Sequence, residues 1–450
     1  MMQSIISFLK NKKILILGFG REGKSSLAFF KTYLPSLKIT IADKNKIDLE
    51  KDEDISIITG DNYLDCLNDF DIVLKSPGIS LKNIDISNVN ISSQLDLFLT
   101  FSNITTIGIT GTKGKTTTST LIYNVLKDSG KKCFLLGNIG VPVFDCLPHI
   151  TKDSIAVIEM SSHQLEFMTH SPNISVITNF YQEHLDHYLS YEHYINAKLN
   201  IFRFQKNSDY CIFNIDQPEY LDKIQNVAHS NQLKITLSNH KDNCIFLDHN
   251  FNIVYKDKYF CVKGLNKNLI GNHHFYDMLF TFAVCNILNI SPLVIESSLR
   301  DFAGIPHRME CVGKFNDILF YNDSIATIPA AVINAVNSLK HVDTLIIGGM
   351  DRGIDYTDFS KFLAKSNISN IICLYETGQK IATLVKSLDP LTDSKIYIAK
   401  DLEDAVNFAF SHTKKNSICL LSPAAPSYGY FKNFEERGNE YKRLVTSYDN

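Results

Sequence analysis

Residues 106–118 read TIGITGTKGKTTT, and this stretch constrains the fold and the chemistry of the chain more than any other. An apolar, β-branched run predicts a strand, a glycine-rich turn follows it, and a helix is expected to open at Lys115. Glycines let backbone N–H groups point into the turn, Lys115 can reach the β- and γ-phosphates of a nucleotide, and a threonine hydroxyl can hold Mg²⁺. The predicted phosphate loop consists of Gly111, Thr112, Lys113, Gly114, Lys115, Thr116 and Thr117.

The loop is a variant of the usual pattern, which has a glycine where this chain has Ile109. The alternative interpretation is a tight strand-to-helix turn whose lysine is merely solvated. The glycine pair, the lysine, the threonines and the flanking strand together favour the phosphate loop.

A second glycine-rich turn lies near the start of the sequence. Residues 14–17 predict a strand, Gly18, Gly20 and Gly23 follow with the spacing Gly-x-Gly-x-x-Gly, and Asp43 ends the next predicted strand. This arrangement is the fingerprint of a dinucleotide-binding unit. Taken alone, it predicts a nicotinamide-dependent oxidoreductase.

Short runs rich in Ile and Val alternate with helical patterns, so we predict an α/β fold built on parallel sheets. Three parts are expected: a Rossmann-like domain at 1–100, a central P-loop domain at 101–304 and a C-terminal Rossmann-like domain at 305–450. Glu159 follows a predicted strand at the edge to which the phosphate loop belongs, where a carboxylate is a natural Mg²⁺ ligand. A helix cap or an ion pair would also explain this acid.

The composition is that of an ordinary globular protein. The chain has 450 residues, 44% of them apolar, and a net charge of −3, which argues against a dedicated nucleic-acid or membrane-surface protein. No segment has the pattern of a signal peptide or a membrane span. The ten cysteines lie singly, as expected for reduced thiols. We therefore expect a cytoplasmic protein, monomeric and without a nucleic-acid partner.

Further motifs occur in a fixed order along the chain. They are EMSSHQLE at 159–166, Asn179 with His184 and Asp186, Tyr194 with Lys198, His307-Arg308, NDSIAT at 322–327, SPAAPS at 422–427 and FEERG at 434–438. Together with the phosphate loop they resemble the Mur ligases, and the resemblance spans Gly18 to about Tyr441. The turn Ser76-Pro77-Gly78 and the C-terminal segment favour the glutamate-adding branch.

The resemblance implies an ATP-dependent amide ligase of bacterial peptidoglycan precursor synthesis. Such an enzyme would transfer the ATP γ-phosphate to the carboxylate of UDP-N-acetylmuramoyl-L-alanine, and the amine of glutamate would attack the acyl phosphate. This chemistry depends on positioning and on cations around developing oxyanions. The N-terminal glycine turn would then hold the UDP moiety rather than NAD.

The resemblance also implies the residues of the site. The catalytic residues would be Lys115, Glu159, His184, Lys198 and Asp323. Two Mg²⁺ ions would be held by Thr116, Glu159, His184 and a carbamylated Lys198. Besides the loop, ATP would contact His274, Arg308 and Asp323. The substrate-binding residues would be Gly18, Arg21, Asp43, Lys44, Ser76, Gly78, Asn138, Ser161, Gln164, Thr327, Arg352, Ser427, Tyr428 and Phe434.

The histidine-rich segment around His184 also suggests zinc, but its spacing matches no zinc pattern and no cysteine is close in sequence. Two departures from the family pattern concern ATP: His274 replaces an asparagine that contacts the base, and Lys113 replaces an asparagine of the loop. The family commonly has a lysine at the position of Ile325. The Asp-Ser-Ile-Ala-Thr form of this chain looks similar to that of related ligases that add L-glutamate. D-glutamate is the first expectation and L-glutamate the second.

Two hypotheses from other classes remain open. A nicotinamide-dependent oxidoreductase would use the N-terminal turn, but it leaves the phosphate loop unexplained. A nucleotide-binding regulator could keep the loop and lack catalysis, with His274 and Ile325 as signs of that loss.

Overall fold

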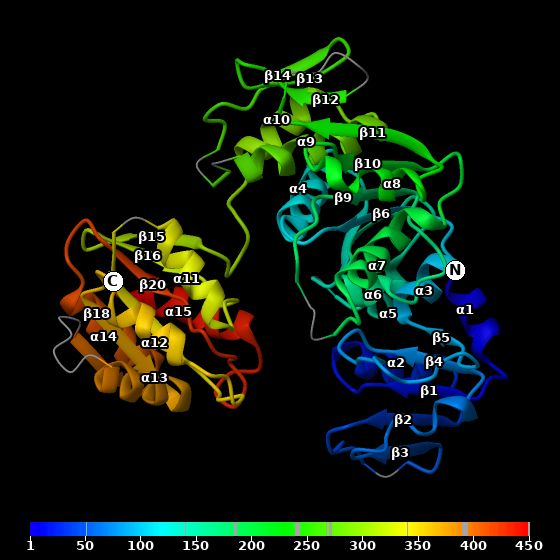
Figure 1. The fold of residues 1–450 in the computed structure, drawn as a ribbon, viewed down its shortest axis with the longest axis horizontal. Coiled ribbons are helices and arrows are strands. Elements are labelled where there is room, and N and C mark those ends of the chain that lie inside the picture. Colours follow the sequence, from blue (N-terminus) through cyan, green and yellow to red (C-terminus); the bar gives the residue numbers. More distant parts are fainter. Residues whose placement is uncertain are drawn as a thin grey trace. The chain divides into compact units, whose positions relative to one another are not determined.

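The computed structural model describes residues 1–50, 52–139, 141–183, 187–238, 244–266, 268–269, 272–339, 341–388 and 395–448. The chain divides into two compact units, Met1–Phe302 and Ala303–Asn450. Strands and helices alternate in both units, which confirms the α/β class (Figure 1). Among the described residues, no helix combines the length and the apolarity needed to cross a membrane.

The first unit begins with a five-stranded sheet whose strands run parallel in the order β3-β2-β1-β4-β5. The strands are β1 (Ile14–Leu17), β2 (Ile39–Asp43), β3 (Ile55–Thr59), β4 (Ile72–Lys75) and β5 (Ile91–Ser92). The helices are α1 (Met2–Leu9), α2 (Arg21–Tyr33), η1 (Leu67–Asp69) and α3 (Gln94–Thr100). The strand order reverses between β1 and β4, and ligands of open sheets bind at such a switch point.

The same unit contains a second sheet, in the order β14-β13-β12-β11-β10-β9-β6-β8-β7. Its strands are β6 (Thr105–Thr110), β7 (Cys133–Gly137), β8 (Ile155–Glu159), β9 (Ile174–Ile177), β10 (Tyr210–Asn214), β11 (Asn231–Thr236), β12 (Cys244–Leu247), β13 (Asn252–Tyr255) and β14 (Lys258–Cys261). The pairs from β7 to β12 are parallel, and β13 and β14 are antiparallel. The antiparallel end was not predicted.

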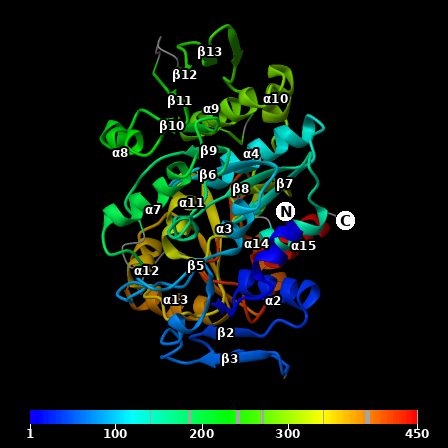
Figure 2. The same cartoon turned by 90° about the vertical axis from the view of Figure 1, so that its right-hand side faces the viewer.

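The helices of the second sheet are α4 (Lys115–Asp128), α5 (Val143–Cys146), η2 (Leu147–His149), α6 (Ser162–Leu165), α7 (Tyr191–Arg203), η3 (Pro218–Tyr220), α8 (Leu221–Gln225), α9 (Asn272–Ile287) and α10 (Pro292–Arg300). The helices α9 and α10 pack against α4, the helix that follows the phosphate loop (Figure 1 and Figure 2). Residues far apart in sequence therefore meet at the phosphate loop.

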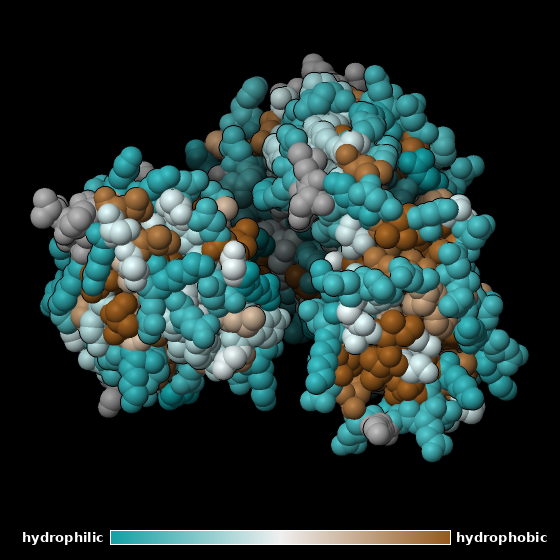
Figure 3. All heavy atoms as spheres, turned by 60° about the horizontal axis from the view of Figure 1, so that its bottom comes forward, coloured by the Kyte–Doolittle hydropathy of each residue, from teal (hydrophilic) through white to brown (hydrophobic). Residues whose placement is uncertain are grey.

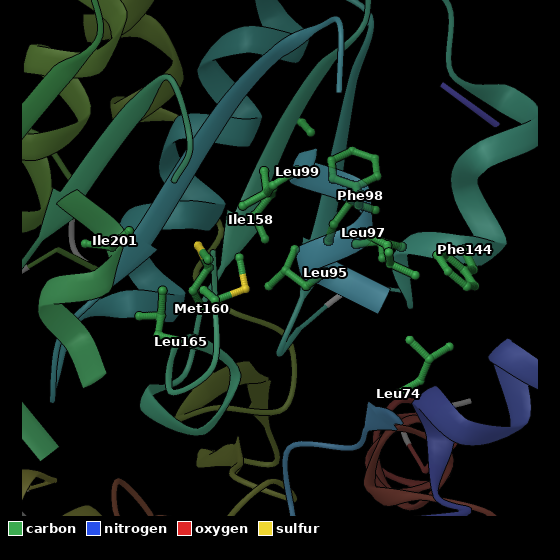
Figure 4. Packing of buried hydrophobic residues seen from close by; sticks show 14 of the residues in the cluster. Leu74, Leu95, Leu97, Phe98, Leu99, Phe144, Ile158, Met160, Leu165 and Ile201 are labelled. Atoms are coloured by element: carbon green, nitrogen blue, oxygen red, sulfur yellow. The ribbon is translucent and has the colours of Figure 1, made fainter. Parts of the chain in front are cut away.

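One hydrophobic cluster joins the two sheets of the first unit. Leu74 from β4 and Ile158 from β8 belong to it, with Phe98 of α3 and Phe144 of α5 between them in sequence (Figure 4). All four side chains are at most 3% exposed. Because this apolar surface is removed from water on both sides, the two sheets fold as one packed unit.

The second unit has a six-stranded sheet in the order β15-β16-β20-β17-β18-β19. Its strands are β15 (Glu310–Phe315), β16 (Ile318–Asn322), β17 (Val342–Gly348), β18 (Asn370–Leu374), β19 (Lys395–Ala399) and β20 (Ile418–Leu421). Its helices are α11 (Pro329–Ser338), α12 (Thr357–Ala364), α13 (Tyr375–Leu388), α14 (Leu402–His412) and α15 (Phe434–Ser447). The helices α11, α12 and α13 cover one face, and α14 and α15 cover the other.

Among the described residues of the second unit, β15 is the one strand that pairs antiparallel, and the turn to β16 explains it. Asn316 and Asp317, the two residues between these strands, have φ angles of 48° and 64°. A two-residue hairpin turn favours positive φ at both positions, and Asn and Asp tolerate it. On the face that Figure 3 shows, hydrophilic residues are spread over each unit with apolar patches between them, as is normal for a protein surface.

Candidate active site

The phosphate loop joins β6 to α4 as the sequence predicts. Gly111 has a φ of 146° and Gly114 has a φ of 84°, both in regions that favour glycine. A Cβ atom at Gly111 would overlap the Thr178 hydroxyl, and one at Gly114 would lie 2.8 Å from Asp277 Oδ1. The loop therefore needs glycine for its backbone conformation and for the space around it. The N-terminus of α4 follows directly, with Thr116 partly buried and Thr117 buried in its first turn.

Two lysines converge on one backbone oxygen of this loop. Lys115 Nζ donates to Gly111 O at 2.9 Å and to Thr112 O at 2.9 Å, and Lys198 Nζ donates to Gly111 O at 2.8 Å. Lys198 lies on α7 and is 2% exposed. Burial, followed by the charge of Lys115, lowers the pKa of Lys198 well below its ordinary value. Burial thus disfavours the charged form of Lys198, in contrast with the solvated lysine that its sequence alone suggests.

Glu159 is the last residue of β8 and is 1% exposed. Its Oε1 accepts a hydrogen bond from Asn138 Nδ2 at 2.6 Å, whereas its Oε2 is buried without a partner among the described residues. A buried carboxylate oxygen without a donor is costly, and a divalent cation would relieve that cost. Glu159 and the threonines of the loop are hard oxygen donors of the kind that Mg²⁺ prefers, so these residues fit the ion.

No group of three or more His, Cys, Asp and Glu residues in the described part of the chain could hold a metal by itself. Mg²⁺ sites commonly use one or two carboxylates together with substrate phosphates, so such a group is not required. The predicted ligand His184, together with Asp186, lies outside the described residues.

Supporting residues that sequence reasoning did not assign fix the phosphate loop. Asn179 Oδ1 accepts from the backbone N–H of Lys113 at 2.8 Å, and Asn179 Nδ2 donates to Lys113 O at 3.0 Å. The hydroxyls of Tyr194 and Thr112 lie 2.9 Å apart. Lys113 Nζ pairs with Glu183. Asn179 and Tyr194 both stand in motifs noted in the sequence, so the signal was present and only the roles were missed.

His274 lies at the start of α9 and is paired with a second residue that was not assigned. Its Nδ1 lies 3.1 Å from Asp277 Oδ2, and Asp277 Oδ1 accepts from Thr118 Oγ1 at 2.8 Å. Asp277 is 3% exposed. His274 is thereby linked to the first turn of α4, which places it near the loop; its contact with the base remains a prediction.

Ser161 and Gln164 form a capping box at the start of α6. Gln164 N donates to Ser161 Oγ at 3.2 Å, and Ser161 N donates to Gln164 Oε1 at 3.0 Å. Gln164 Nε2 donates in turn to Glu22 Oε1 of the first sheet at 3.0 Å. Both side chains thus have local partners, and their contact with a substrate remains a prediction.

The N-terminal glycine turn lies at the switch point of the first sheet. Gly18 has a φ of 89°, and a Cβ there would lie 2.8 Å from Ile79. Ser76 Oγ donates to Gly18 O at 2.8 Å, and Asp43 Oδ2 accepts from the N–H of Phe19 at 2.8 Å. The structure thus brings Gly18, Asp43 and Ser76 together.

Three further residues predicted for this edge are exposed. Arg21 is exposed at the first position of α2, and Lys44 is exposed with its Nζ 3.8 Å from Asp61 Oδ1. A Cβ atom added to Gly78 would meet no atom within 4 Å.

In the second unit, Asp323 follows β16 and is 4% exposed. Ser422 Oγ donates to its Oδ2 at 2.8 Å, and Met309 N donates to its Oδ1 at 3.2 Å. Burial raises the pKa of Asp323 to about 6, against the opposing effects of these hydrogen bonds and of the Arg308 charge. The predicted pair Arg308 and Asp323 therefore lies close enough to interact, with Arg308 exposed.

The residues predicted for the amino-acid substrate lie in the second unit as well. The Arg352 guanidinium lies 5.6 Å from the centre of the Tyr428 ring, and Tyr428 is 50% exposed. Ser427 is buried, while Thr327 and Phe434 are partly buried. Arg352 and Tyr428 of this set are in mutual contact, a cation over an aromatic face.

Arg437 is a supporting residue that the sequence motif contained but did not explain. It is 1% exposed and donates to Ser324 Oγ at 3.0 Å, Ser324 O at 2.8 Å and Ala425 O at 3.1 Å. Burial lowers its pKa to about 10. Arg437 thus ties the segment of Asp323 to the segment of Ser427.

Comparison with known proteins agrees with this geometry. Residues 109–285 match the Mur ligase middle domain, and residues 307–425 match the Mur ligase, glutamate ligase domain. Among solved structures, UDP-N-acetylmuramate-alanine ligase from Thermotoga maritima is 19% identical with a TM-score of 0.55, covering 97% of this chain and 100% of that one. A MurF ligase from Acinetobacter baumannii is 15% identical with a TM-score of 0.59, covering 93% and 88%. These structures share the fold.

Curated relatives are closer in sequence. The UDP-N-acetylmuramoylalanine--D-glutamate ligase of Acetivibrio thermocellus is 34% identical over 462 residues, covering 98% of this chain and 97% of its own. The enzyme of the same name from Clostridium botulinum strain 657 is 32% identical over 454 residues, covering 98% of each chain. The two domain matches and the near-complete alignments lead to one conclusion: the chain belongs to the Mur ligase family.

Proposed function

We propose that the protein is an ATP-dependent ligase that adds D-glutamate to UDP-N-acetylmuramoyl-L-alanine in peptidoglycan precursor synthesis. The observation that carries this proposal is the convergence of Lys115 and Lys198 on Gly111 O, in a glycine loop at a helix N-terminus. The names of the relatives at 34% and 32% identity supply the substrates. A MurF ligase of this fold from Thermotoga maritima was solved with ADP, in agreement with ATP as the phosphate donor.

In the proposed reaction, a carboxylate oxygen of the muramoyl-alanine substrate attacks the γ-phosphorus of ATP and ADP leaves. The amine of glutamate then attacks the carbonyl carbon of the acyl phosphate, and the tetrahedral intermediate loses phosphate as the amide forms. The loop N–H groups and the Lys115 ammonium hold and neutralise the transferring phosphoryl group. Positioning of three substrates supplies the remaining rate enhancement.

Thr116, Glu159, His184 and Lys198 are the residues that would hold Mg²⁺. When bound, the ion neutralises phosphate charge during transfer. For this role Lys198 would first become a carbamate: its neutral Nζ attacks the carbon of CO₂ and releases a proton. The lowered pKa of Lys198 supports this step, because only the unprotonated amine reacts. The buried, unpartnered Oε2 of Glu159 supports a cation at the same site.

The two substrates would use different units of the chain. The UDP moiety would bind at the turn around Gly18, together with Asp43, Lys44, Ser76 and Gly78. The carboxylate of Asp43 can accept hydrogen bonds from ribose hydroxyls. Arg352 suits the side-chain carboxylate of glutamate, since a guanidinium can make a bidentate contact. We propose the functional segments 1–100, 101–304 and 305–450, and a cytoplasmic monomer.

L-glutamate is a second candidate because of one residue. Ile325 follows Ser324 at the centre of the Asp323 segment, and an isoleucine supplies no charge there. The family commonly has a lysine at this position, so the reaction centre of this chain differs where the incoming amine arrives.

The test is phosphate release from ATP by the purified protein with Mg²⁺ and UDP-N-acetylmuramoyl-L-alanine, with D-glutamate and L-glutamate offered in parallel. The proposal predicts turnover with the D-isomer only. Turnover with the L-isomer alone would assign the stereochemical choice to the segment of Ile325. No turnover with either isomer, in a preparation that binds ATP, would refute the proposed function.

A further inference from the structure

A buried lysine stands at the switch point of the first sheet, outside every set of residues discussed so far. Lys75 is the last residue of β4 and is opposite Leu17 of β1, next to Gly18. Its side chain is 3% exposed, and its Nζ lies 3.9 Å from Glu166 Oε2 and 5.4 Å from the centre of the Phe167 ring. Burial lowers the pKa of Lys75, and the charges of Glu166 and Glu22 oppose that shift.

The two carboxylates around Lys75 come from different elements, and each holds another side chain. Glu22, in the first turn of α2, accepts from Gln164 Nε2 at 3.0 Å. Glu166, which follows α6, lies 3.1 Å from His187 Nε2 through its Oε2. Lys75 therefore interacts with two acids, one of which contacts Gln164 of α6 and the other His187.

A direct contact between Lys75 and a ligand does not fit this environment. The cavity that Lys75 lines with Gln164 and Phe167 has a volume of about 10 Å³, which is room for about one water molecule. Two carboxylates against one ammonium also disfavour an anionic group there. The chemistry of the cluster is that of support: the ammonium favours the charged form of each acid, so that both stay available as hydrogen-bond acceptors.

We propose that Lys75 is a positioning residue for the nucleotide-sugar acceptor, acting through Glu22 on Gln164 and through Glu166 on His187. The inference rests on the proposed function, since it concerns the acceptor of that reaction. Without the ammonium, the buried Glu22 loses a charge that opposes its protonation, and Glu166 loses its ion pair. Each acid can then take up a proton or turn to solvent, and the side chain that it holds loses its orientation.

The test compares Lys75→Met with the wild type in the phosphate-release assay. Methionine keeps the apolar stem and removes the charge. We expect the KM for UDP-N-acetylmuramoyl-L-alanine to rise about tenfold, the effect of losing one oriented hydrogen bond, while the KM for ATP stays within about twofold. Lys24→Met, an exposed lysine on α2, is the matched control and should leave both constants unchanged.

A double variant separates this role from a general loss of structure. Adding Glu22→Gln to Lys75→Met removes the buried carboxylate that has lost its counter-charge and keeps an acceptor for Gln164, so we expect the acceptor KM to fall back to about threefold above the wild type. Unchanged acceptor KM in a folded Lys75→Met, or an equal rise in the KM for ATP, would overturn the inference. If Lys75→Met fails to fold, the double variant decides: an acceptor KM that stays about tenfold or more above that of the wild type would overturn it, because neutralising Glu22 would then not restore Gln164. If the wild type itself shows no turnover, the proposed function fails and this inference fails with it.

Discussion

The first unit contains two glycine turns that share a backbone design and differ in the charge of their side chains. Each follows a parallel strand and precedes a helix, at Gly18–Gly23 after β1 and at Gly111–Gly114 after β6. At the first turn a carboxylate, Asp43, accepts from the backbone N–H of Phe19. At the second, Lys115 and Lys198 donate to the backbone oxygen of Gly111.

The two turns share a need for glycine and differ in the side chains that face them. Both turns require glycine for the same reason: a Cβ atom at Gly23 would overlap Gly18 O, and one at Gly111 would overlap the Thr178 hydroxyl. Both turns are therefore too tightly packed for a side chain, and they differ in the side chains that face them: Asp43 ends β2, whereas Lys115 opens α4 and Lys198 lies on α7. An acid suits the hydroxyl groups of a ribose, and lysines suit phosphates.

The largest effect is expected from removing the cation that distinguishes the second turn. Lys115→Ala should lower kcat/KM by at least about 100-fold, because a lost charge contact to a transferring phosphoryl group is worth about 3 kcal/mol. Steady-state phosphate release measures this. Lys127→Ala is the matched control, an exposed lysine in the last turn of the same helix. Near-normal activity of Lys115→Ala would break the comparison.

Lys198→Ala tests the second amine at the same turn. We expect an activity loss of about 100-fold, with partial recovery when short carboxylates such as formate or acetate are added, because they can replace a carbamate. Phosphate release is measured with and without the added acid. Full activity of the variant would show that Lys198 has no catalytic role, and inactivity that no carboxylate relieves would contradict the carbamate.

The requirement for glycine at Gly111 can be tested with alanine substitutions. Gly111→Ala should cost about 3 kcal/mol of unfolding free energy, because it places a Cβ at positive φ and against Thr178. Gly20→Ala in the first turn should cost much less, since no atom lies within 4 Å of its Cβ position. Urea denaturation of both variants decides; equal costs would mean that the Gly111 conformation is not required.

The smallest effect is expected at Asp323, a carboxylate that follows strand β16 of the second unit. The quantity that changes is the stability of the fold. Its folded pKa of about 6 exceeds the ordinary value of 3.8, so the fold favours the protonated form. The stability that protonation contributes is complete below about pH 4 and is lost as the pH rises through about 6.

Asp323→Asn should therefore stabilise the protein by about 2 kcal/mol at pH 8 and by almost nothing at pH 4. The variant keeps an oxygen for Met309 N, and its amide can donate to Ser422. Urea denaturation across this pH range measures the effect. A stabilisation that does not depend on pH would show that the ionisation of Asp323 is not its cause.

The sequence predicted those features that depend on short-range patterns. The strand, the glycine turn and the helix after residue 106, and the corresponding unit after residue 14, follow from apolar runs and glycine spacing, and the structure confirms both. The antiparallel strands β13, β14 and β15 were not predicted, because short hairpins at the edge of a parallel sheet leave a weak local signal.

Long-range contacts account for what the sequence could not show. The burial of Lys198, the link from Gln164 to Glu22, and the pairing of Asp277 with Thr118 join residues far apart in the chain. No local pattern distinguishes such a lysine or aspartate from a solvated one. The family resemblance named Lys198 as a candidate, and its role stays a prediction; it did not point to the supporting residues Asp277 and Arg437.

The most direct test of the account is a crossed binding experiment on the two glycine turns. Calorimetric titrations would measure a non-hydrolysable ATP analogue with Mg²⁺, and UDP-N-acetylmuramoyl-L-alanine, against the wild type, Lys115→Ala and Asp43→Ala. The account predicts that Lys115→Ala weakens the ATP analogue by at least about tenfold and leaves the UDP substrate within about twofold, and that Asp43→Ala does the reverse. If either variant weakened both ligands equally, or neither variant weakened any, the assignment of different ligands to the two turns would be wrong.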